Sequence, residues 1–402
     1  MNPASPPLLS LPPNVLALVD ALARAGGRAL LVGGSVRDAL LQQPAGDLDF
    51  EVHGLSLAAL RTVLKRFGKV NEVGRSFGVF KLRIDGQELD ISVPRRDSKV
   101  GPGHRGIQAE ADPELGVVEA ARRRDLTINA IAWDPRTDEL VDPFGGAGDL
   151  AARRLRAVDP ATFAEDPLRA LRVAQFAARF AFEVAPELAD LCRGMALGEL
   201  PAERVRGEIE KLLLRGKRPS IGWNFAYRAE LWARVVPEWD HPCPEALDAL
   251  AALPVEGAPR RLALLLAAAT EASRALPLLD RLHVFRQDGY DVRGQVLALL
   301  AARSASFPEL EQATRARRLA ETVDVELFAA LTGDAALLET AEALGASRSP
   351  LLPLLSGRDL LELGMVPGPE LGRVLAEVRE EQLAGRLSSP EVALAWARTR
   401  IR

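Results

Sequence analysis

Two aspartates, Asp47 and Asp49, are separated by one residue in a short apolar stretch of this 402-residue chain. Side chains at positions i and i+2 of a strand point to the same face, so the two carboxylates would lie side by side and repel each other without a cation. Mg²⁺ binds carboxylate oxygens together with substrate phosphates, and can activate a hydroxyl and stabilise a leaving pyrophosphate. The pair therefore predicts phosphoryl transfer with Asp47 and Asp49 as Mg²⁺ ligands. The alternative is a solvated strand end that carries two acids.

A third carboxylate lies in another strand-like segment. Asp90 is flanked by Leu89 and Ile91, so its side chain would point away from these apolar neighbours. If the two strands are adjacent, Asp90 joins the aspartate pair as a third catalytic acid. The alternative is a position on the solvated face.

A pair of glycines precedes the aspartates. Gly33 and Gly34 follow the apolar run 28–32 and lead into a helical segment. Glycine lets the backbone approach a ligand closely, and free N–H groups at a helix start attract phosphate. Alone this pattern is weak, because glycine turns after strands are common; together with the aspartates it predicts a nucleotide-phosphate site.

Three consecutive arginines, Arg122, Arg123 and Arg124, precede Asp125 and an apolar segment. A run of charges is usually a solvated face. Close to clustered acids, however, arginines suit a polyphosphate, which guanidinium groups bind in a bidentate manner. Asp125 would then accept a hydrogen bond from a ribose hydroxyl.

Asp166, Arg169 and Arg172 follow one another at intervals of three residues in a helical segment. In a helix they would share one face. A carboxylate acceptor beside a guanidinium donor can satisfy the Watson–Crick edge of a nucleobase, so that no template is needed. The alternative is a surface ion pair between Asp166 and Arg169, worth only a few tenths of a kcal/mol.

The elements around these residues predict an α+β protein. Strand-like runs and turn residues crowd the first part of the chain, and from about Asp149 onward helical periodicity continues to the end. We expect the stretch between Val93 and Ala121 to be a long functional loop, and the first dozen residues to be disordered. The predicted strands are 28–32, 47–52, 79–84, 88–93, 127–133 and 139–141, with a helix at 57–67. The predicted domains are 1–27 (extension and helix), 28–148 (catalytic head), 149–220 (neck) and 221–402 (body and tail).

Composition constrains the setting. The formal net charge is −4, so any nucleic-acid binding must come from local basic faces. Two cysteines, Cys192 and Cys243, are too few for a disulfide framework and indicate a reducing compartment. The sequence shows no signal-peptide pattern and no apolar run long enough to span a bilayer. We therefore expect a soluble cytoplasmic protein without membrane contact.

Several segments together resemble one family. "GGSVRD" followed by "DLD" is similar to the first motif of the class II tRNA nucleotidyltransferases, which are the CCA-adding enzymes, and of the related bacterial poly(A) polymerases. The other similar segments are, in order, "RRDLTINAIA", "DPFGGAGDL", "EDPLRALRVAQFAARF", "PAERVRGEIEKLL" and "SGRDLLELGMVPGPELGRVLAEV". In this family they correspond to nucleotide binding, a hinge, base recognition, helix stabilisation and a tRNA-holding tail.

The resemblance implies a polymerase-β-like nucleotidyltransferase head followed by an all-helical neck, body and tail. It also implies Mg²⁺ as cofactor, tRNA as partner and substrate, and CTP and ATP as the nucleotides. The expected activity is template-independent addition of CMP and AMP to the tRNA 3′ end with release of pyrophosphate. Addition of the terminal A alone and poly(A) synthesis share this chemistry, and a non-catalytic RNA-binding protein is a remote alternative. The implied site comprises Asp47 and Asp49 with the metals, Asp90, and a nucleotide-binding set of Gly33, Gly34, Arg37, Arg123, Arg124, Asp125, Asp166, Arg169 and Arg172.

Overall fold

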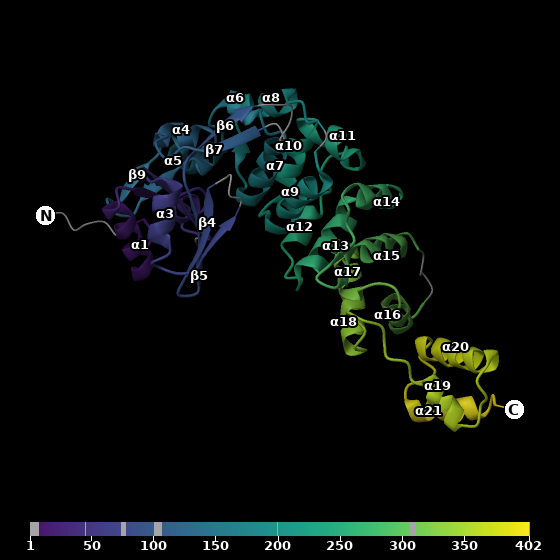
Figure 1. Cartoon of the computed structure of the whole chain (residues 1–402). Helices are drawn as coiled ribbons and strands as arrows, with labels where there is room; N and C mark the ends of the chain where they lie inside the picture. Colours follow the sequence, from purple (N-terminus) through teal and green to yellow (C-terminus); the bar gives the residue numbers. More distant parts are fainter. Residues whose placement is uncertain are drawn as a thin grey trace. The chain divides into compact units, whose positions relative to one another are not determined.

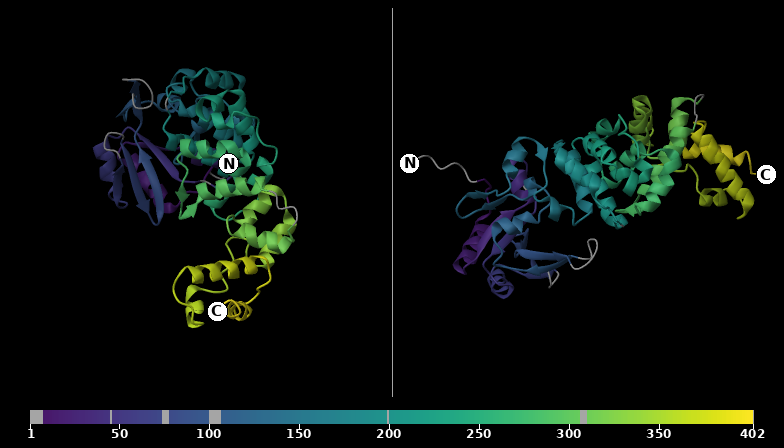
Figure 2. Two further views of the ribbon diagram at one scale, coloured as in Figure 1. Left: turned by 90° about the vertical axis from the view of Figure 1, so that its right-hand side faces the viewer. Right: turned by 90° about the horizontal axis from the view of Figure 1, so that it is seen from above.

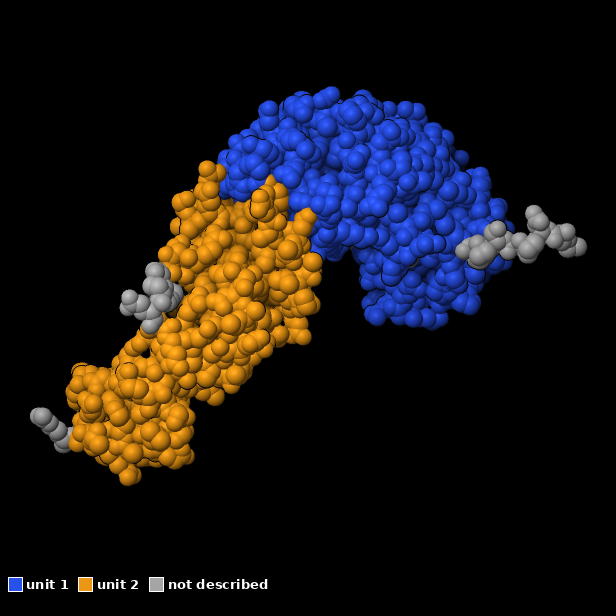
Figure 3. All heavy atoms as spheres, turned by 180° about the vertical axis from the view of Figure 1, so that it is seen from behind, with its two compact units in different colours: residues 1–242 blue, residues 243–402 orange. Residues whose placement is uncertain are grey.

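The chain divides into two compact units, residues 1–242 and 243–402 (Figure 3). The computed structural model describes residues 8–44, 46–73, 78–99, 107–198, 200–305 and 310–401. Most of the N-terminal segment for which disorder is expected, residues 1–7, lies outside these ranges. The finer division into head, neck, body and tail stays a prediction.

Within the described residues, the first unit contains a seven-stranded mixed sheet (Figure 1) with strand order β3-β4-β5-β2-β1-β8-β9. Apolar side chains such as Leu30, Phe50 and Phe80 are fully buried in it. Strands β2 and β5 are parallel, and their register sets Asp49 opposite Asp90, so the sheet brings these two carboxylates together. The strands are β1 (Arg28–Val32), β2 (Leu48–His53), β3 (Val70–Val73), β4 (Val79–Ile84), β5 (Gln87–Ser92), β8 (Ala132–Asp134) and β9 (Glu139–Val141).

Two parts of the predicted head are wrong. The strand expected at 127–133 is a 3₁₀ turn, η2 (Thr127–Asn129), followed by the short strand β8. Its polar side chains make local hydrogen bonds instead of joining a ladder: the Thr127 hydroxyl donates to Asp149 and the Asn129 amide to Asp125. The expected long loop contains a hairpin of β6 (Arg95–Lys99) and β7 (Ile107–Ala111), followed by helix α4 (Val117–Arg122). Residues 100–106 of this loop lie outside the described residues.

The rest of the first unit is mainly helical. Helix α7 (Leu168–Phe180) packs against α9 (Ala202–Arg215) and α10 (Pro219–Arg228), and is buried on most of its surface. Three buried tryptophans, Trp223, Trp232 and Trp239, pack together beside it, with ring centroids 4.5–5.6 Å apart. The other elements are α1 (Pro13–Arg24), α2 (Gly34–Leu40), α3 (Leu57–Leu64), α5 (Gly146–Ala151), α6 (Pro160–Phe163), α8 (Pro186–Gly194), α11 (Leu231–Val235) and η3 (Pro237–Trp239), with short strands β10 (Arg154–Leu155) and β11 (Glu183–Val184).

The second unit is an array of helices (Figure 2). Within it, α20 packs on α19 and α21. Two-residue strands β12 and β13 form a hairpin that the sequence did not indicate. The elements of the second unit are α12 (Leu247–Ala251), α13 (Ala258–Ala269), α14 (Ala272–Arg281), β12 (Arg286–Gln287), β13 (Tyr290–Asp291), α15 (Val292–Ser304), α16 (Gln312–Ala320), α17 (Val325–Thr332), α18 (Ala335–Ala343), α19 (Gly357–Glu362), α20 (Pro369–Leu383) and α21 (Pro390–Arg398). No helix in the described part of the chain is long and apolar enough to cross a membrane.

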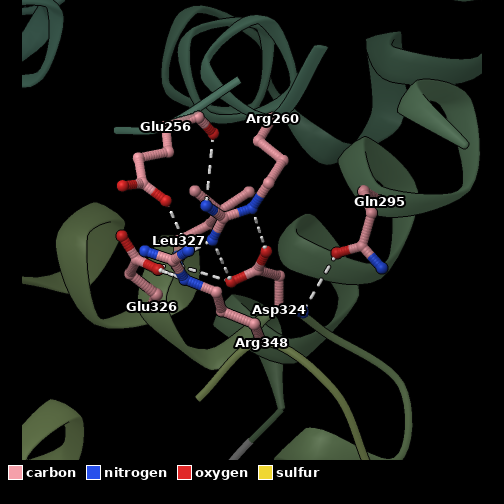
Figure 4. A network of polar contacts seen from close by, with 7 residues as sticks. All are labelled: Glu256, Arg260, Gln295, Asp324, Glu326, Leu327 and Arg348. Carbon is pink, nitrogen blue, oxygen red and sulfur yellow. Dashed lines mark hydrogen bonds and ion pairs between the residues drawn. The ribbon is translucent and has the colours of Figure 1, made fainter. Parts of the chain in front are cut away.

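An ion network joins three helices of the second unit (Figure 4). Arg260 on α13 donates to Asp324 and Glu326 at 2.7 and 2.8 Å, and Arg348 donates to Glu326 at 2.6 Å. The Gln295 side chain on α15 accepts from the Asp324 backbone N–H, at the start of α17. The Asp324 side chain is almost fully buried, so losing Arg260 would leave an uncompensated charge in the core.

We predict that Gly222→Ala destabilises the first unit. A Cβ at this position of α10 would lie 2.1 Å from the Ala174 carbonyl oxygen and 2.9 Å from the Ala178 Cβ on α7, so the helices would have to move apart. Overpacking of this kind costs about 1–3 kcal/mol. The matched control is Gly207→Ala on α9, where a Cβ would meet no described atom within 4 Å and helix propensity would rise. Thermal unfolding of both variants is the measurement, and an unchanged Tm for Gly222→Ala would contradict this packing.

Candidate active site

The glycine turn lies between β1 and α2. Gly33 has φ +74°, a conformation that favours glycine, and a Cβ there would lie 3.1 Å from Nη1 of Arg124. Glycine therefore keeps the backbone close to this guanidinium. Arg124 also donates to the Asn129 carbonyl at 3.2 Å, which fixes its position beside the turn.

Asp49 lies at the centre of the acidic group. Burial raises the pKa of Asp49 to about 6, the neighbouring Asp90 and Asp47 carboxylates add to this, and Arg124 opposes it. Asp90 pairs with Lys81 at 3.1 Å, while Asp47 is exposed. These aspartates provide an all-oxygen set of ligands, which fits Mg²⁺. Among the described residues, no group of three or more acidic, histidine or cysteine side chains is arranged as a preformed metal site.

A pocket of about 620 Å³ joins the sheet to the helices of the first unit. It brings together most of the predicted site and adds residues that were not predicted to bind the nucleotide. Three predicted residues, Asp47, Asp90 and Arg123, do not line it. The predicted residues that line it are Gly33, Gly34, Arg37, Asp49, Arg124, Asp125, Asp166, Arg169 and Arg172, and the additional ones are Asn129, Leu168, Phe176, Arg204 and Glu208.

Asp125 is a buried anchor within this pocket. Its Oδ1 accepts from the Leu126 N–H and the Asn129 amide, and its Oδ2 accepts from Arg172 at 2.7 Å. Burial alone would raise the pKa of Asp125, but the Arg172 charge and these hydrogen bonds outweigh it and hold the pKa below its usual value. The carboxylate expected to accept from a ribose hydroxyl is therefore engaged in orienting Arg172.

Arg37 is also held on several sides. Its Nε donates to Asp38 at 2.8 Å and its Nη1 to Asn129 at 2.6 Å. Its guanidinium lies over the Phe180 ring, 4.8 Å from the centroid. Although Arg37 lines the pocket, most of its hydrogen-bonding capacity is used within the protein.

The predicted base-reading residues do not share a helical face. Helix α7 begins at Leu168, so Asp166 precedes it and accepts from the Leu168 N–H at 3.1 Å. This part of the prediction is wrong because Pro167 sets the helix start. The alternative of a surface ion pair also fails: Asp166 pairs with Arg204 at 3.1 Å, and Arg169 donates to the carbonyls of Thr162 and Arg123.

The pocket also contains Arg204 and Glu208, which the resemblance assigned to helix stabilisation and not to nucleotide binding. They lie four residues apart on α9 and appeared only within a segment expected to stabilise a helix. The sequence did contain a signal that these two residues lie together, since positions i and i+4 of a helix share a face. This helix also has one apolar side and one charged side.

Comparison with known proteins finds a family match in the first part of the chain. Residues 29–156 match the family described as the poly A polymerase head domain. The chain is 45% identical over 215 residues to the Multifunctional CCA protein of Stenotrophomonas maltophilia, covering 52% of this chain and 51% of that protein. A protein of the same name from Xylella fastidiosa is 45% identical over 193 residues, 46% and 44% of the two chains. The chain thus matches about half the length of these relatives.

Solved structures extend the similarity beyond the head. The CCA-adding enzyme of Bacillus stearothermophilus in complex with CTP superimposes with a TM-score of 0.69 and 25% identity, covering 97% of this chain and 98% of that one. The Thermotoga maritima enzyme complexed with tRNA gives 0.69 and 22%, covering 98% and 97%. The resemblance inferred from the motifs is confirmed, as is the fold class of a mixed-sheet nucleotidyltransferase head followed by helices.

We predict that Asp125→Asn lowers the free energy of unfolding at neutral pH by about 1.5–3 kcal/mol, because a charge-assisted hydrogen bond to Arg172 is lost. The pKa of Asp125 is lowered by folding, so its contribution is present above the unfolded pKa of about 4 and lost as the pH falls through the folded pKa. The difference in the free energy of unfolding between wild type and Asp125→Asn should therefore decrease below roughly pH 4. Denaturant unfolding between neutral and acidic pH measures it; a constant gap would contradict the assignment. Asp190→Asn, whose carboxylate forms only an exposed pair with Arg193, is the control.

Proposed function

We propose that this chain is a template-independent nucleotidyltransferase that adds CMP and AMP to the 3′ end of tRNA, from CTP and ATP, and releases pyrophosphate. The observation that carries the proposal is the composition of one pocket. It joins Asp49 and the glycine turn of the head to Asp166, Arg169 and Arg172 beside and on α7. Phosphoryl-transfer chemistry and hydrogen-bonding groups suited to a base edge thus meet in one site.

The proposed reaction uses the residues as follows. The tRNA 3′ hydroxyl attacks the α-phosphate of the nucleotide in the pocket. Mg²⁺, held by Asp47 and Asp49 with Asp90 nearby, would neutralise phosphate charge and assist ionisation of the hydroxyl. Arginine side chains bind the triphosphate oxygens, with Arg124 beside the glycine turn and Arg123 at the edge of the site. The base is held by Asp166 and Arg169, with Arg172 fixed by Asp125 in support.

The comparisons support this proposal over its alternatives. The relatives, about half of whose length matches this chain, are named Multifunctional CCA protein. The similar solved structures include complexes with CTP and with tRNA. Addition of the terminal A alone and poly(A) synthesis would use the same site. A non-catalytic RNA-binding role would not explain why the half-buried Asp49 carboxylate lies opposite Asp90 in the sheet. A cytoplasmic location stays a prediction from the cysteine content.

The deciding experiment uses three tRNA transcripts, one lacking CCA, one ending in CC and one complete, each with CTP, ATP or both. We expect the first to gain CCA only with both nucleotides, the second to gain A with ATP, and the third to remain unchanged. Extension of the second transcript alone would favour an A-adding enzyme, and long A tails on all three would favour a poly(A) polymerase. No extension of any transcript would contradict catalysis.

A second prediction tests the carboxylates. Asp47→Ala and Asp49→Ala should abolish nucleotide addition while tRNA affinity is retained, because phosphate contacts elsewhere persist. Asp90→Asn should lower kcat on the order of tenfold to a hundredfold.

The matched control for Asp90→Asn is Glu88→Gln. Both acids bind Lys81, at 3.1 and 2.8 Å, but only Asp90 lies opposite Asp49. Equal losses in the two variants would assign the effect to Lys81, and undiminished turnover in Asp47→Ala and Asp49→Ala would rule out these residues as metal ligands.

A further inference from the structure

One face of strand β2 carries polar side chains into the interior of the first unit. Asp49, Glu51 and His53 alternate along this strand, so they point to the same face of the sheet. Asp49 lines the pocket, whereas Glu51 and His53 are only 4% and 8% exposed. Apolar side chains are the usual occupants of such positions, and a buried charge is costly unless it is paired. The partners of Glu51 and His53 lie at the two ends of helix α4.

His53 holds the segment that leads into α4. Its Nδ1 lies 3.0 Å from the Leu115 carbonyl oxygen, and because a carbonyl oxygen only accepts, Nδ1 carries a hydrogen and donates. The neighbouring Gly54 N–H donates to the Pro113 carbonyl at 2.8 Å. These bonds fix the imidazole with its Nε2 toward Glu51, 3.3 Å from Oε1. The ring therefore limits where the Glu51 carboxylate can lie.

The other end of α4 leads to Arg124, whose guanidinium faces Glu51. Nη2 of Arg124 lies 3.9 Å from Oε2 of Glu51. The Arg124 charge also acts on Asp49, where it opposes the rise in pKa that burial causes. Arg124 thus has two acids near it, one buried behind it and one in the pocket. If it paired with Asp49, it would occupy the carboxylate expected to hold Mg²⁺, and fewer of its N–H groups would be available to a phosphate.

We propose that Glu51 is a positioning residue for nucleotide binding. Its carboxylate, fixed by His53, holds the Arg124 guanidinium beside the glycine turn, where it binds the triphosphate, and keeps it from pairing with Asp49. The inference rests on the proposed function, in which Arg124 is a triphosphate ligand. Glu51 does not line the pocket, so its effect on the nucleotide passes through Arg124.

This role predicts a change in affinity opposite in sign to that expected from charge alone. Removal of a negative charge close to a triphosphate site should strengthen binding of the anionic nucleotide, because like charges repel. Loss of a positioning carboxylate should instead weaken binding, because Arg124 is released toward Asp49. The direction of the change in affinity therefore separates the two effects.

The test is calorimetric binding of CTP to the full-length chain in EDTA and without tRNA, so that neither Mg²⁺ nor the reaction contributes. Glu51→Gln keeps the shape of the side chain and removes its charge. It should weaken CTP binding on the order of tenfold, the equivalent of one charge-assisted hydrogen bond. The inhibition constant of cytidine, measured by competition with CTP, should be the same in wild type and variant, because cytidine carries no phosphate.

A double-mutant cycle shows whether Glu51 acts through Arg124. Arg124→Ala alone should weaken CTP binding at least as much as Glu51→Gln does. In the Arg124→Ala background, Glu51→Gln should cause no further loss. His53→Asn keeps a donor toward Leu115 but removes Nε2, so it should weaken CTP binding by less than Glu51→Gln.

The matched control is Glu72→Gln on β3. Glu72 is a partly buried acid of the same sheet, and it lies 3.7 Å from Arg61 outside the pocket. Because this pair has no contact with Arg124, Glu72→Gln should leave the affinity for CTP unchanged. A loss equal to that of Glu51→Gln would show that any lost ion pair in the sheet weakens binding, which would overturn the inference.

Other outcomes are equally decisive. Unchanged or tighter CTP binding by Glu51→Gln with a wild-type Tm would overturn the inference, as would additive losses in the cycle, an equal loss of cytidine binding, or no CTP binding by wild type in EDTA. Unchanged CTP binding by His53→Asn would overturn the role of His53. If Glu51→Gln fails to fold, Glu51→Asp, which withdraws the carboxylate by one methylene, provides the comparison, with a smaller loss expected. The transcript assay with Mg²⁺ tests the proposed function separately, so tRNA extension together with unchanged CTP affinity in Glu51→Gln would remove only the inference.

Discussion

The site depends on the contact between α2 in the head and α7, because these helices carry different parts of one pocket. The Asp38 carboxylate accepts hydrogen bonds from Arg37 at 2.8 Å and from Arg179 at 3.2 Å. The Arg37 guanidinium lies over the rings of Phe176 and Phe180, 5.5 and 4.8 Å from their centroids. At the other end of α7, Arg172 binds Asp125, which binds Asn129, which accepts from Arg37. The chain of contacts closes on itself, so that neither helix can shift without breaking charge-assisted bonds.

This closed set of contacts explains why arginine and phenylalanine occur together on one side of α7. Positions 172, 176, 179 and 180 fall on one side of a helix, and the sequence alternates arginine with phenylalanine there. A cation over an aromatic ring contributes about 0.5–2 kcal/mol, more when desolvated, and the contact needs no exact hydrogen-bond geometry. On the opposite side, Gly222 lets α10 approach the backbone of α7. The helix is therefore fixed from both sides, which gives the rigid support that the proposed template-independent reaction would require.

The local periodicity of apolar residues was enough to predict some strands and helices of this structure, but it did not predict the others. Strands 28–32, 79–84 and 139–141 lie where they were predicted, and 79–84 shows the alternation of buried and less buried side chains. The approach of Asp90 to Asp49 follows from the register of β2 and β5. Thr127–Asn129 misled because apolar neighbours suggest a strand, while the side chains bond to Asp149 and Asp125, which lie elsewhere along the chain. Arg204 and Glu208 were assigned to helix stabilisation and not to the site, because they reach the pocket only when α9 packs against α7. The role of such residues is determined by contacts with segments that are distant along the chain. A single sequence does not show which segments come into contact.

In the proposed function, protein side chains take the place of a template, and the same tertiary bonds would restrain those side chains. A base in a duplex is selected because a wrong partner leaves donors or acceptors unpaired. Side chains can impose that penalty only if they cannot turn to meet the wrong base. Arg169 is restrained by the carbonyls of Thr162 and Arg123, and Asp166 by the Leu168 N–H and Arg204. Each group thus loses an internal bond if it reorients, a loss of about 1 kcal/mol or more per bond. If Asp166 and Arg169 hold the base as proposed, these internal bonds would make an incorrect nucleotide costly to accommodate.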